Sequence, residues 1–153
     1  MTDEAPQGRP EAPEIGLGVL MFIPYRHLEQ RILAVVLEAG HPITLAQARI
    51  FQRIDHRGSR LTGLAESAQL TKQAAGFLVD QLERAGYVAR APDPQDGRAR
   101  VIRITPRGYD VIAVATAEQA RIEGEWASHL GPGATEALRQ ALERLREITD
   151  PFR

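Results

Sequence analysis

The chain has 153 residues, of which 43% are hydrophobic and 25% are charged. This length suits one domain or a compact domain with extensions, and the composition allows a packed core and argues against global disorder. Cysteine is absent, so disulfides, thiolate metal sites and cysteine nucleophiles are excluded.

The N-terminal region lacks the features of a secretory signal. Residues 1–14 are acidic and rich in proline, without the basic segment that begins a signal peptide, and we predict a disordered tail there. The apolar residues 15–23 are too few to span a bilayer, which needs about 20 residues. With the absence of cysteine, these features predict a cytoplasmic protein with no membrane partner.

The hydrophobic pattern predicts two helices before residue 60. The first covers residues 17–39, bent or started afresh near Pro24, and a Gly-His-Pro break follows it. Thr44 is placed to cap the second helix, which runs to about residue 54. A basic loop over residues 56–60 comes next.

Residues 60–86 have the pattern of two helices joined by a turn. Thr62 is placed to cap the first helix, and residues 69–70 make the turn. Thr71 caps the second helix over residues 72–85, which ends at the stop signal Gly86. The apolar residues of this second helix recur at helical spacing: Ala75, Leu78, Val79 and Leu82.

A hairpin and two further helices complete the pattern. Residues 87–90 and 101–104 have the β-branched and aromatic content of paired strands, and residues 92–97 have the Pro and Asp-Gly of a turn. Thr105-Pro106 begins a long helix to about residue 130, and Gly-Pro-Gly separates it from a last helix over residues 134–149. The predicted class is mostly α (α+β), a winged helix-turn-helix with helices at both ends.

The net charge of −1 hides an uneven distribution. Residues 57–108 contain nine basic and five acidic residues, a net charge of +4. The segments before and after them carry −2 and −3. Because phosphates attract a local patch, the winged-helix segment has the charge expected of a nucleic-acid-binding surface.

Five blocks, in this order and at these spacings, resemble the MarR family of bacterial transcriptional regulators. They are LTGLAE at 61–66, LTKQAA at 70–75, LERAGYV at 82–88, DPQDGRAR at 93–100 and ITPRG at 104–108. They span about a third of the chain. The resemblance implies a DNA-binding region over residues 43–105 and a homodimer built from the helical residues 15–39 and 106–153.

The outer helices have apolar faces that a winged helix alone does not need. Such faces pack on each other and on a second subunit, or they form one intramolecular core. The residues concerned are Leu17, Leu20, Met21 and Leu28 in the first helix, Tyr109, Ile112, Ala113, Ala120, Ile122, Trp126 and Leu130 in the fifth, and Leu138, Leu142, Leu145 and Ile148 in the sixth.

The candidate base-reading residues lie at the start of the second helix of the motif, which enters the major groove in a helix-turn-helix. They are Thr71, Lys72, Gln73, Ala74 and Phe77. Gln73 could pair with adenine, and Lys72 could contact guanine or a phosphate. Without the surrounding pattern, these positions would be an ordinary polar helix face. Phe77 departs from the polar or basic residue that the family often has, and it touches thymine methyls or folds into the core.

Candidate backbone contacts flank this helix. The resemblance places a minor-groove arginine at Arg98, with Asp96 bracing the wing turn. Arg100 contacts phosphate or pairs with an acid. Arg57, Ser59 and Arg60 are candidate phosphate clamps, and a solvated loop is the equally weighted alternative.

Other chemistry is poorly supported by the sequence. The four histidines have no metal-site spacing, no catalytic constellation is present, and we expect no cofactor. The resemblance implies a cavity for a small aromatic or phenolic effector, which Tyr25 and Trp126 would line; both are alternatively dimer-core residues.

The sequence therefore predicts a dimeric, bacterial, nucleoid-associated transcriptional regulator, a repressor, that binds a pseudo-palindromic double-stranded site and responds to a small ligand. Two alternatives compete with it. One is a winged helix used for protein–protein contact, and the other is an uncharacterised enzyme.

Overall fold

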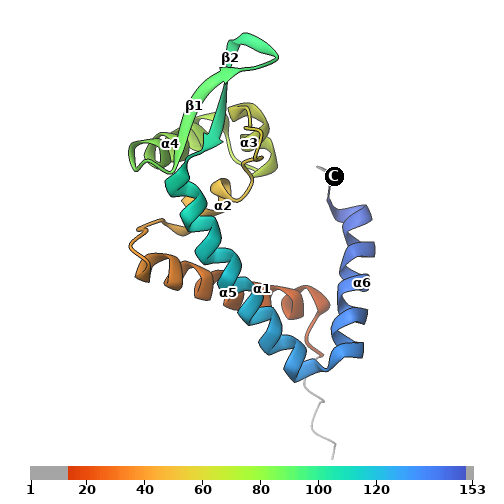
Figure 1. Cartoon of the computed structure of the whole chain (residues 1–153). Coiled ribbons are helices and arrows are strands. Elements are labelled where there is room, and N and C mark those ends of the chain that lie inside the picture. The colour runs from red at the N-terminus through yellow and green to blue at the C-terminus, as the bar shows by residue number, and fades with distance from the viewer. Residues whose placement is uncertain (1–13, 151–153) are drawn as a thin grey trace, which may run out of the picture.

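The computed structural model describes residues 14–150, which form six helices and a two-stranded antiparallel sheet (Figure 1). The elements are α1 (Leu17–Glu38), α2 (Leu45–Phe51), α3 (Leu61–Ser67), α4 (Lys72–Arg84), β1 (Val88–Asp93), β2 (Asp96–Ile104), α5 (Pro106–Leu130) and α6 (Pro132–Thr149). This confirms the predicted mostly α, winged-helix class. The tail predicted at residues 1–14 lies, apart from Glu14, outside the described residues.

Three threonines begin helices as the sequence predicts. Thr44 and Gln47 form a reciprocal capping box at the start of α2. The Thr71 hydroxyl accepts a hydrogen bond from the backbone N–H of Ala74 at 3.1 Å and so caps α4. Thr105 caps α5 ahead of a proline in its first turn. In each case the hydroxyl satisfies an N–H that the first turn leaves unpaired.

Several predicted boundaries are wrong by a few residues. α2 ends at Phe51 rather than near residue 54. Arg60, not Thr62, occupies the cap position of α3, so Thr62 lies inside that helix and does not cap it. α1 continues through Pro24 as one helix and does not start afresh there, although a proline at this position has no N–H to donate to the carbonyl one turn earlier.

The wing has longer strands and a tighter turn than predicted. Val88 pairs with Ile104, and the pairing continues to Asp93 and Asp96, with an irregularity at Pro92. Only residues 94–95 lie between the strands. The Asp93 carboxylate accepts the N–H of Gln95 at 2.9 Å, so an aspartate closes the turn where positive φ at Asp-Gly was expected.

The hydrophobic core lies where α2, α3, α4 and the base of the hairpin meet α1 and α5. The fully buried side chains include Ile50 of α2, Leu64 of α3 and Leu82 of α4. Val36 of α1 and Val111 of α5 belong to the same cluster. The winged helix and the paired helices α1 and α5 therefore share one core.

α1 and α5 are also joined by a charged cluster. The Arg31 guanidinium of α1 donates to the Glu118 carboxylate from Nε at 3.0 Å and also pairs with Glu125. Glu118 is only 6% exposed. Arg31 lowers the pKa of Glu125 by hydrogen bonding, and the two glutamates raise the pKa of Arg31. This pairing fixes the middle of α1 against the distal half of α5.

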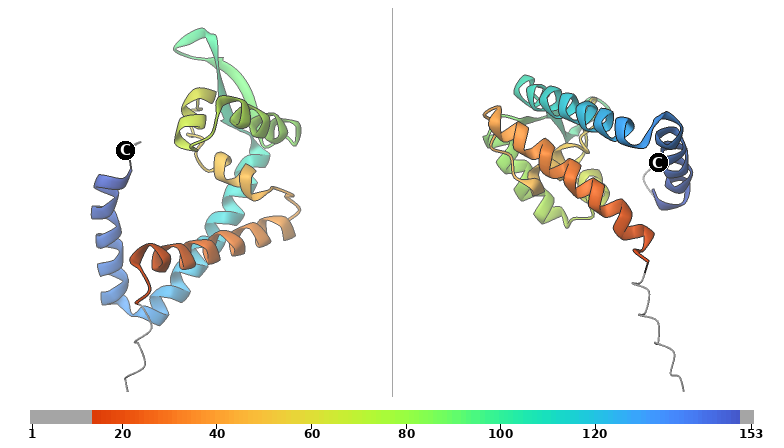
Figure 2. Two further views of the ribbon diagram at one scale, coloured as in Figure 1. Left: turned by 180° about the vertical axis from the view of Figure 1, so that it is seen from behind. Right: turned by 90° about the horizontal axis from the view of Figure 1, so that it is seen from below.

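α6 lies apart from the winged helix, and Figure 2 shows it beyond the crossing of α1 and α5. None of its residues is buried. Leu138, Leu142 and Ile148 are 47%, 44% and 84% exposed. The N-terminal half of α1 is equally open, with Leu17 at 70% and Phe22 at 54%. Because most helical stability in proteins comes from packing an apolar face, and contiguous exposed apolar patches mark interaction sites, these faces suit cover that the single chain does not supply.

A close contact joins the base of the wing to α5. The Thr105 hydroxyl donates to the Gly86 carbonyl at 2.6 Å and accepts the N–H of Gly108 at 3.1 Å. The Thr105 N–H donates to the Tyr87 carbonyl at 3.1 Å. A Cβ on Gly108 would lie 2.3 Å from that carbonyl oxygen and 2.7 Å from the Ile104 side chain, so only glycine fits.

We predict that Gly108→Ala destabilises the fold by about 1–3 kcal/mol, because the added methyl group must displace backbone. Gly63→Ala is the control: a Cβ there meets nothing within 4 Å, and alanine favours helix over glycine by up to about 1 kcal/mol. Urea unfolding of both variants measures the difference. Equal stability of the two variants would contradict the close contact.

Candidate nucleic-acid interface and ligand cavity

The outward face of α4 carries the predicted base-reading residues. Thr71, Lys72, Gln73 and Ala74 are all exposed. Phe77 is 59% exposed, so the structure answers the question that the sequence left open: Phe77 does not fold into the core. The opposite face holds Ala75 and Val79, which are 0% exposed and fix the rotation of the helix.

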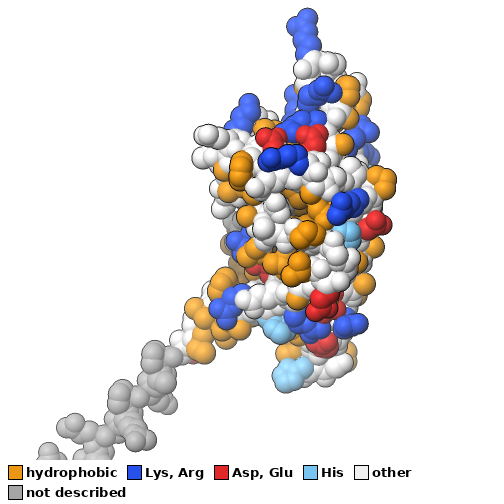
Figure 3. Space-filling model, turned by 90° about the vertical axis from the view of Figure 1, so that its left-hand side faces the viewer, with side chains coloured by type: hydrophobic (Ala, Val, Ile, Leu, Met, Phe, Trp, Pro, Cys, Tyr) orange, Lys and Arg blue, Asp and Glu red, His pale blue; other side chains and the backbone are white. Residues whose placement is uncertain are grey.

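The wing projects beyond α3 and α4, and Figure 3 shows Lys and Arg side chains gathered at that end of the molecule. Arg98 and Arg100 on β2 are exposed. The Asp96 carboxylate accepts the N–H of Arg98 at 3.2 Å, as expected of a residue that braces the turn. Within residues 14–150, neither Arg98, Arg100 nor Lys72 forms an ion pair.

Arg60 has a role that the sequence did not reveal. It was a candidate phosphate clamp, but its guanidinium donates to the Asp93 carboxylate at 2.8 Å and lies 3.8 Å from that of Asp96. The Asp93 side chain is 9% exposed. The N–H of Gln95 and the Arg60 guanidinium both lower the pKa of Asp93, so it is charged at neutral pH. Arg60 therefore ties the start of α3 to the wing.

The loop before α3 also supports the wing. Ser59 exchanges two backbone hydrogen bonds with Ile102, at 2.9 and 2.8 Å, and so extends the hairpin by one residue pair. The Ser59 hydroxyl accepts the N–H of Asp55 at 2.9 Å. Arg57 is exposed beside it, and among the described residues its side chain has no acidic partner. Of the three loop candidates, Arg57 is the freest to meet a phosphate.

A second arginine joins the wing to α4. The Arg90 guanidinium of β1 donates to Asp80 at 2.6 Å and also pairs with Glu83. The N–H of Arg90 donates to the Glu83 carboxylate at 2.9 Å. Both acids of α4 are thus held by one arginine, and α4 and the wing form a single unit.

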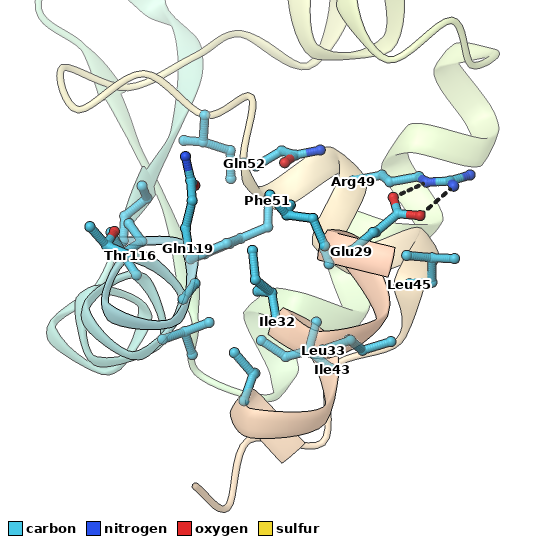
Figure 4. Close-up of a pocket in the computed structure, with 18 of the residues that line it drawn as sticks. Glu29, Ile32, Leu33, Ile43, Leu45, Arg49, Phe51, Gln52, Thr116 and Gln119 are labelled. Carbon is cyan, nitrogen blue, oxygen red and sulfur yellow. Dashed lines mark hydrogen bonds and ion pairs between the residues drawn. The ribbon is translucent and has the colours of Figure 1, made fainter. Parts of the chain in front are cut away.

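A cavity of about 310 Å³ lies between α1, α2 and the first half of α5 (Figure 4). Its walls are mainly apolar, including Ile32, Phe51 and Ile112. Its polar groups come from the residues Tyr25, Glu29, Arg49, Gln52, Thr116 and Gln119. This volume is at the lower end of the range for small-molecule sites.

The two candidate cavity residues have different positions. Tyr25 lines the cavity, whereas Trp126 is not among the lining residues and lies partly buried further along α5. The sequence missed Arg49 and Glu29, which pair at 2.8 and 2.9 Å in the cavity wall. Hydrogen bonding from Arg49 lowers the pKa of Glu29. The wall is therefore close to neutral.

Residues 14–150 contain no group of three or more His, Asp or Glu side chains placed to hold a metal ion. No helix within the same range has the length and apolar content to cross a membrane.

Comparison with known proteins agrees with the geometry. A family model described as MarR family matches residues 41–99. A transcriptional regulator from Thermotoga maritima is 28% identical, with a TM-score of 0.62 over 87% of this chain and 92% of that chain. The structure of MarR is 25% identical, with a TM-score of 0.69 over 87% and 96% of the two chains. No curated protein matches the chain.

A third similar protein, S. aureus MepR, has been solved with two kinds of ligand. A variant bound to an oligodeoxyribonucleotide is 20% identical, with a TM-score of 0.58 over 88% and 98% of the two chains. MepR bound to ethidium bromide is 21% identical, with a TM-score of 0.61 over 87% and 96%. The comparisons confirm the MarR-family resemblance of the winged-helix region, and residues 14–150 have the fold of MarR-family transcriptional regulators.

We predict that Arg60→Gln loosens the wing, because it leaves the Asp93 carboxylate without its cationic partner. Hydrogen exchange of the amides over residues 93–98 should become faster at neutral pH. Arg57→Gln, in the same loop but without an acidic partner, is the control and should leave exchange unchanged.

The pH dependence of the same exchange has a definite sign. Since the pKa of Asp93 is lowered in the folded chain, its contribution is present above the ordinary value of about 3.9 and is lost as the pH falls below it. Two results together would contradict the pairing of Arg60 with Asp93: unchanged exchange of the wing amides in Arg60→Gln, and exchange protection in the unsubstituted chain that does not fall at low pH.

Proposed function

We propose that the chain is a sequence-specific double-stranded DNA-binding transcriptional regulator, a repressor, that acts as a homodimer in the bacterial cytoplasm. One observation carries the proposal. The exposed face of α4, with Gln73 and Lys72, lies at the same end of the molecule as the exposed wing arginines Arg98 and Arg100. Base-reading and phosphate-binding groups are thus available together.

The different chemistry of α4 and of the wing gives them different contacts with DNA. The start of α4 enters the major groove, where the Gln73 amide pairs with the N6 and N7 edge of adenine and Lys72 meets guanine or a phosphate. Thr71 and Ala74 form the adjoining surface. Arg98 at the wing lies in the flanking minor groove, whose negative potential favours arginine, and Arg57 and Arg100 contact the backbone.

The homodimer is supported by the uncovered apolar faces of α1 and α6. Leu138 and Leu142 of α6 and Leu17 and Phe22 of α1 are 44–70% exposed in the single chain. A second copy supplies matching faces by two-fold symmetry, so each patch covers its counterpart. The two α4 helices related by this axis recognise an inverted repeat, whose half-sites lie about one helical turn, roughly 10 bp, apart.

The ligand site that we propose is the cavity between α1, α2 and α5. Its apolar walls fit an aromatic ring, and Tyr25, Gln52 and Gln119 offer hydrogen bonds to a phenolic hydroxyl. Because Arg49 is already paired with Glu29, an uncharged phenol fits this wall better than an anion. Ligand binding would bias the spacing of the two α4 helices and so the affinity for DNA.

One observation favours a second function, a winged helix used for protein–protein contact. Phe77 is a large apolar side chain that is 59% exposed on α4, as a protein-binding anchor would be. The unpaired arginines of the wing favour DNA, and a salt-dependent affinity for duplex DNA separates the two functions.

We predict different effects for Gln73→Ala and Arg98→Ala. Gln73→Ala should cost about 1–3 kcal/mol on the preferred site and relax preference at one base position. Arg98→Ala should weaken specific and scrambled duplexes alike and make the salt dependence shallower by about one unit. Salt titrations of affinity on both duplexes measure this. If neither substitution changes binding, α4 and the wing do not contact DNA.

We predict that the double substitution Leu138→Glu and Leu142→Glu gives a monomer that loses affinity for the inverted repeat, since it places charge on the uncovered face of α6. Gln140→Glu, which places the same charge on the opposite side of the helix, should remain a dimer. Light scattering at micromolar concentration decides between them. A monomeric unsubstituted chain would refute the dimer.

We predict that a phenolic ligand stabilises the folded chain and so raises its melting temperature. At a ligand concentration of 100 times its Kd, the free energy of unfolding should rise by about 2.7 kcal/mol. Ala115→Leu, which adds bulk to the cavity wall, should abolish the shift and leave DNA binding intact. Thermal unfolding across a panel of phenols and benzoates tests this. An unchanged shift in Ala115→Leu would locate the ligand elsewhere.

A further inference from the structure

Phe77 is the large apolar residue on a helix face that is otherwise polar. With 100° of rotation per residue, it lies on the same side of α4 as Gln73, one turn earlier, and Asp80. That side is opposite Ala75 and Val79, which are completely buried. The packing of α4 therefore holds Phe77 outward, and no rotation of the helix can bury it without exposing the core.

The charges around Phe77 suit a polyanion. Both acids of α4, Asp80 and Glu83, are paired with Arg90 on the wing. Lys72 lies at the start of the helix without an ion pair among the described residues. The outward face of α4 thus presents a cation, an amide and an aromatic ring, with its carboxylates held toward β1.

The direction of the Phe77 side chain determines what it meets. Side chains of a helix lean toward its N-terminus, so the ring covers the turn that contains Gln73 and Ala74. If Gln73 reads a base, the ring lies beside that base or its neighbour. In the major groove, the apolar group that a standard base presents is the 5-methyl group of thymine.

We propose that Phe77 is a specificity-determining residue that contacts the 5-methyl group of a thymine next to the base read by Gln73. The inference rests on the proposed DNA-binding function and goes beyond it, since it names the chemical group recognised. A cytosine at the same position lacks the methyl group and is rejected. A 5-methylcytosine carries the same group and recovers part of the contact.

The test uses the full-length chain and the inverted repeat obtained by selection from random duplexes. Each thymine of one half-site is replaced singly by deoxyuridine, which removes only the methyl group. We expect one position at which the replacement weakens binding of the unsubstituted chain about fourfold, the equivalent of ~0.8 kcal/mol for one buried methyl group. The same replacement should have no effect on Phe77→Ala.

A second arm of the test compares cytosine with 5-methylcytosine at the sensitive position, which adds the methyl group without changing the base pair. Cytosine at the sensitive position should bind more weakly than thymine, and 5-methylcytosine should recover about fourfold for the unsubstituted chain but nothing for Phe77→Ala. Because Phe77 is exposed, both proteins should melt at the same temperature.

Two results would overturn the inference and leave the proposed function standing. In one, specific binding is indifferent to deoxyuridine at every position. In the other, replacing the sensitive thymine by deoxyuridine weakens the binding of Phe77→Ala as much as that of the unsubstituted chain, which would mean that the methyl group acts through DNA shape. Absence of any preference for the selected repeat over a scrambled duplex would instead remove the proposed function itself.

Discussion

The contact between Gly108 and the Tyr87 carbonyl determines how the wing and α4 are attached to α5. Thr105 closes it from both sides, since its hydroxyl bonds to the end of α4 through Gly86 and to the start of α5 through Gly108. A side chain at position 108 would collide with backbone, so the approach cannot relax. Arg90 and Arg60 then hold the wing to α4 and α3 through carboxylates. The helix-turn-helix and the wing consequently move with α5 as one body, and any displacement of α5 becomes a displacement of the whole unit.

Pairing decides which arginines are available for another molecule. Arg60 and Arg90 engage Asp93, Asp96, Asp80 and Glu83, which are four of the five acids in residues 57–108. The net charge of the segment includes all of these residues, yet the fields of the two arginines and of their acidic partners largely cancel each other. Seven of the nine cations of this segment remain. Four of these are exposed at the wing end: Arg98 and Arg100 on the wing, Arg57 on the loop beside it and Lys72 at the start of α4. A chain with a net charge of −1 can therefore present a positive surface at one end.

Local chemistry made much of the fold predictable. The caps at Thr44, Thr71 and Thr105 and the stop at Gly86 depend on side chains within a few residues, and all four were predicted correctly. Features that depend on distant partners were not. The pairing of Arg60 with Asp93 joins residues 33 positions apart, and it also explains why the wing turn is closed by a carboxylate. The exposure of Phe77 depends on which face of α4 packs on the core, and the absence of Trp126 from the cavity wall depends on where the cavity ends along α5, which is at Gln119. Tertiary packing sets these features, and local pattern does not report it.

The position of the cavity connects these constraints to regulation. Its α5 wall runs from Val111 to Gln119, after the Gly108 contact and up to the clamp that Arg31 forms with Glu118 and Glu125. At Glu118 and Glu125, α5 is fixed to α1 by Arg31, and at its start α5 is fixed to the helix-turn-helix through Thr105. Under the proposed function, a ligand between α1 and α5 would push on a stretch of α5 that is held at both ends. If Arg31 stays paired with Glu118 and Glu125, that push would tilt the helix-turn-helix and the wing about this point. The length of α5 would convert a small displacement at the cavity into a larger displacement of α4. In the proposed homodimer the same tilt would occur once in each subunit, so it would change the spacing of the two α4 helices rather than the chemistry of either one.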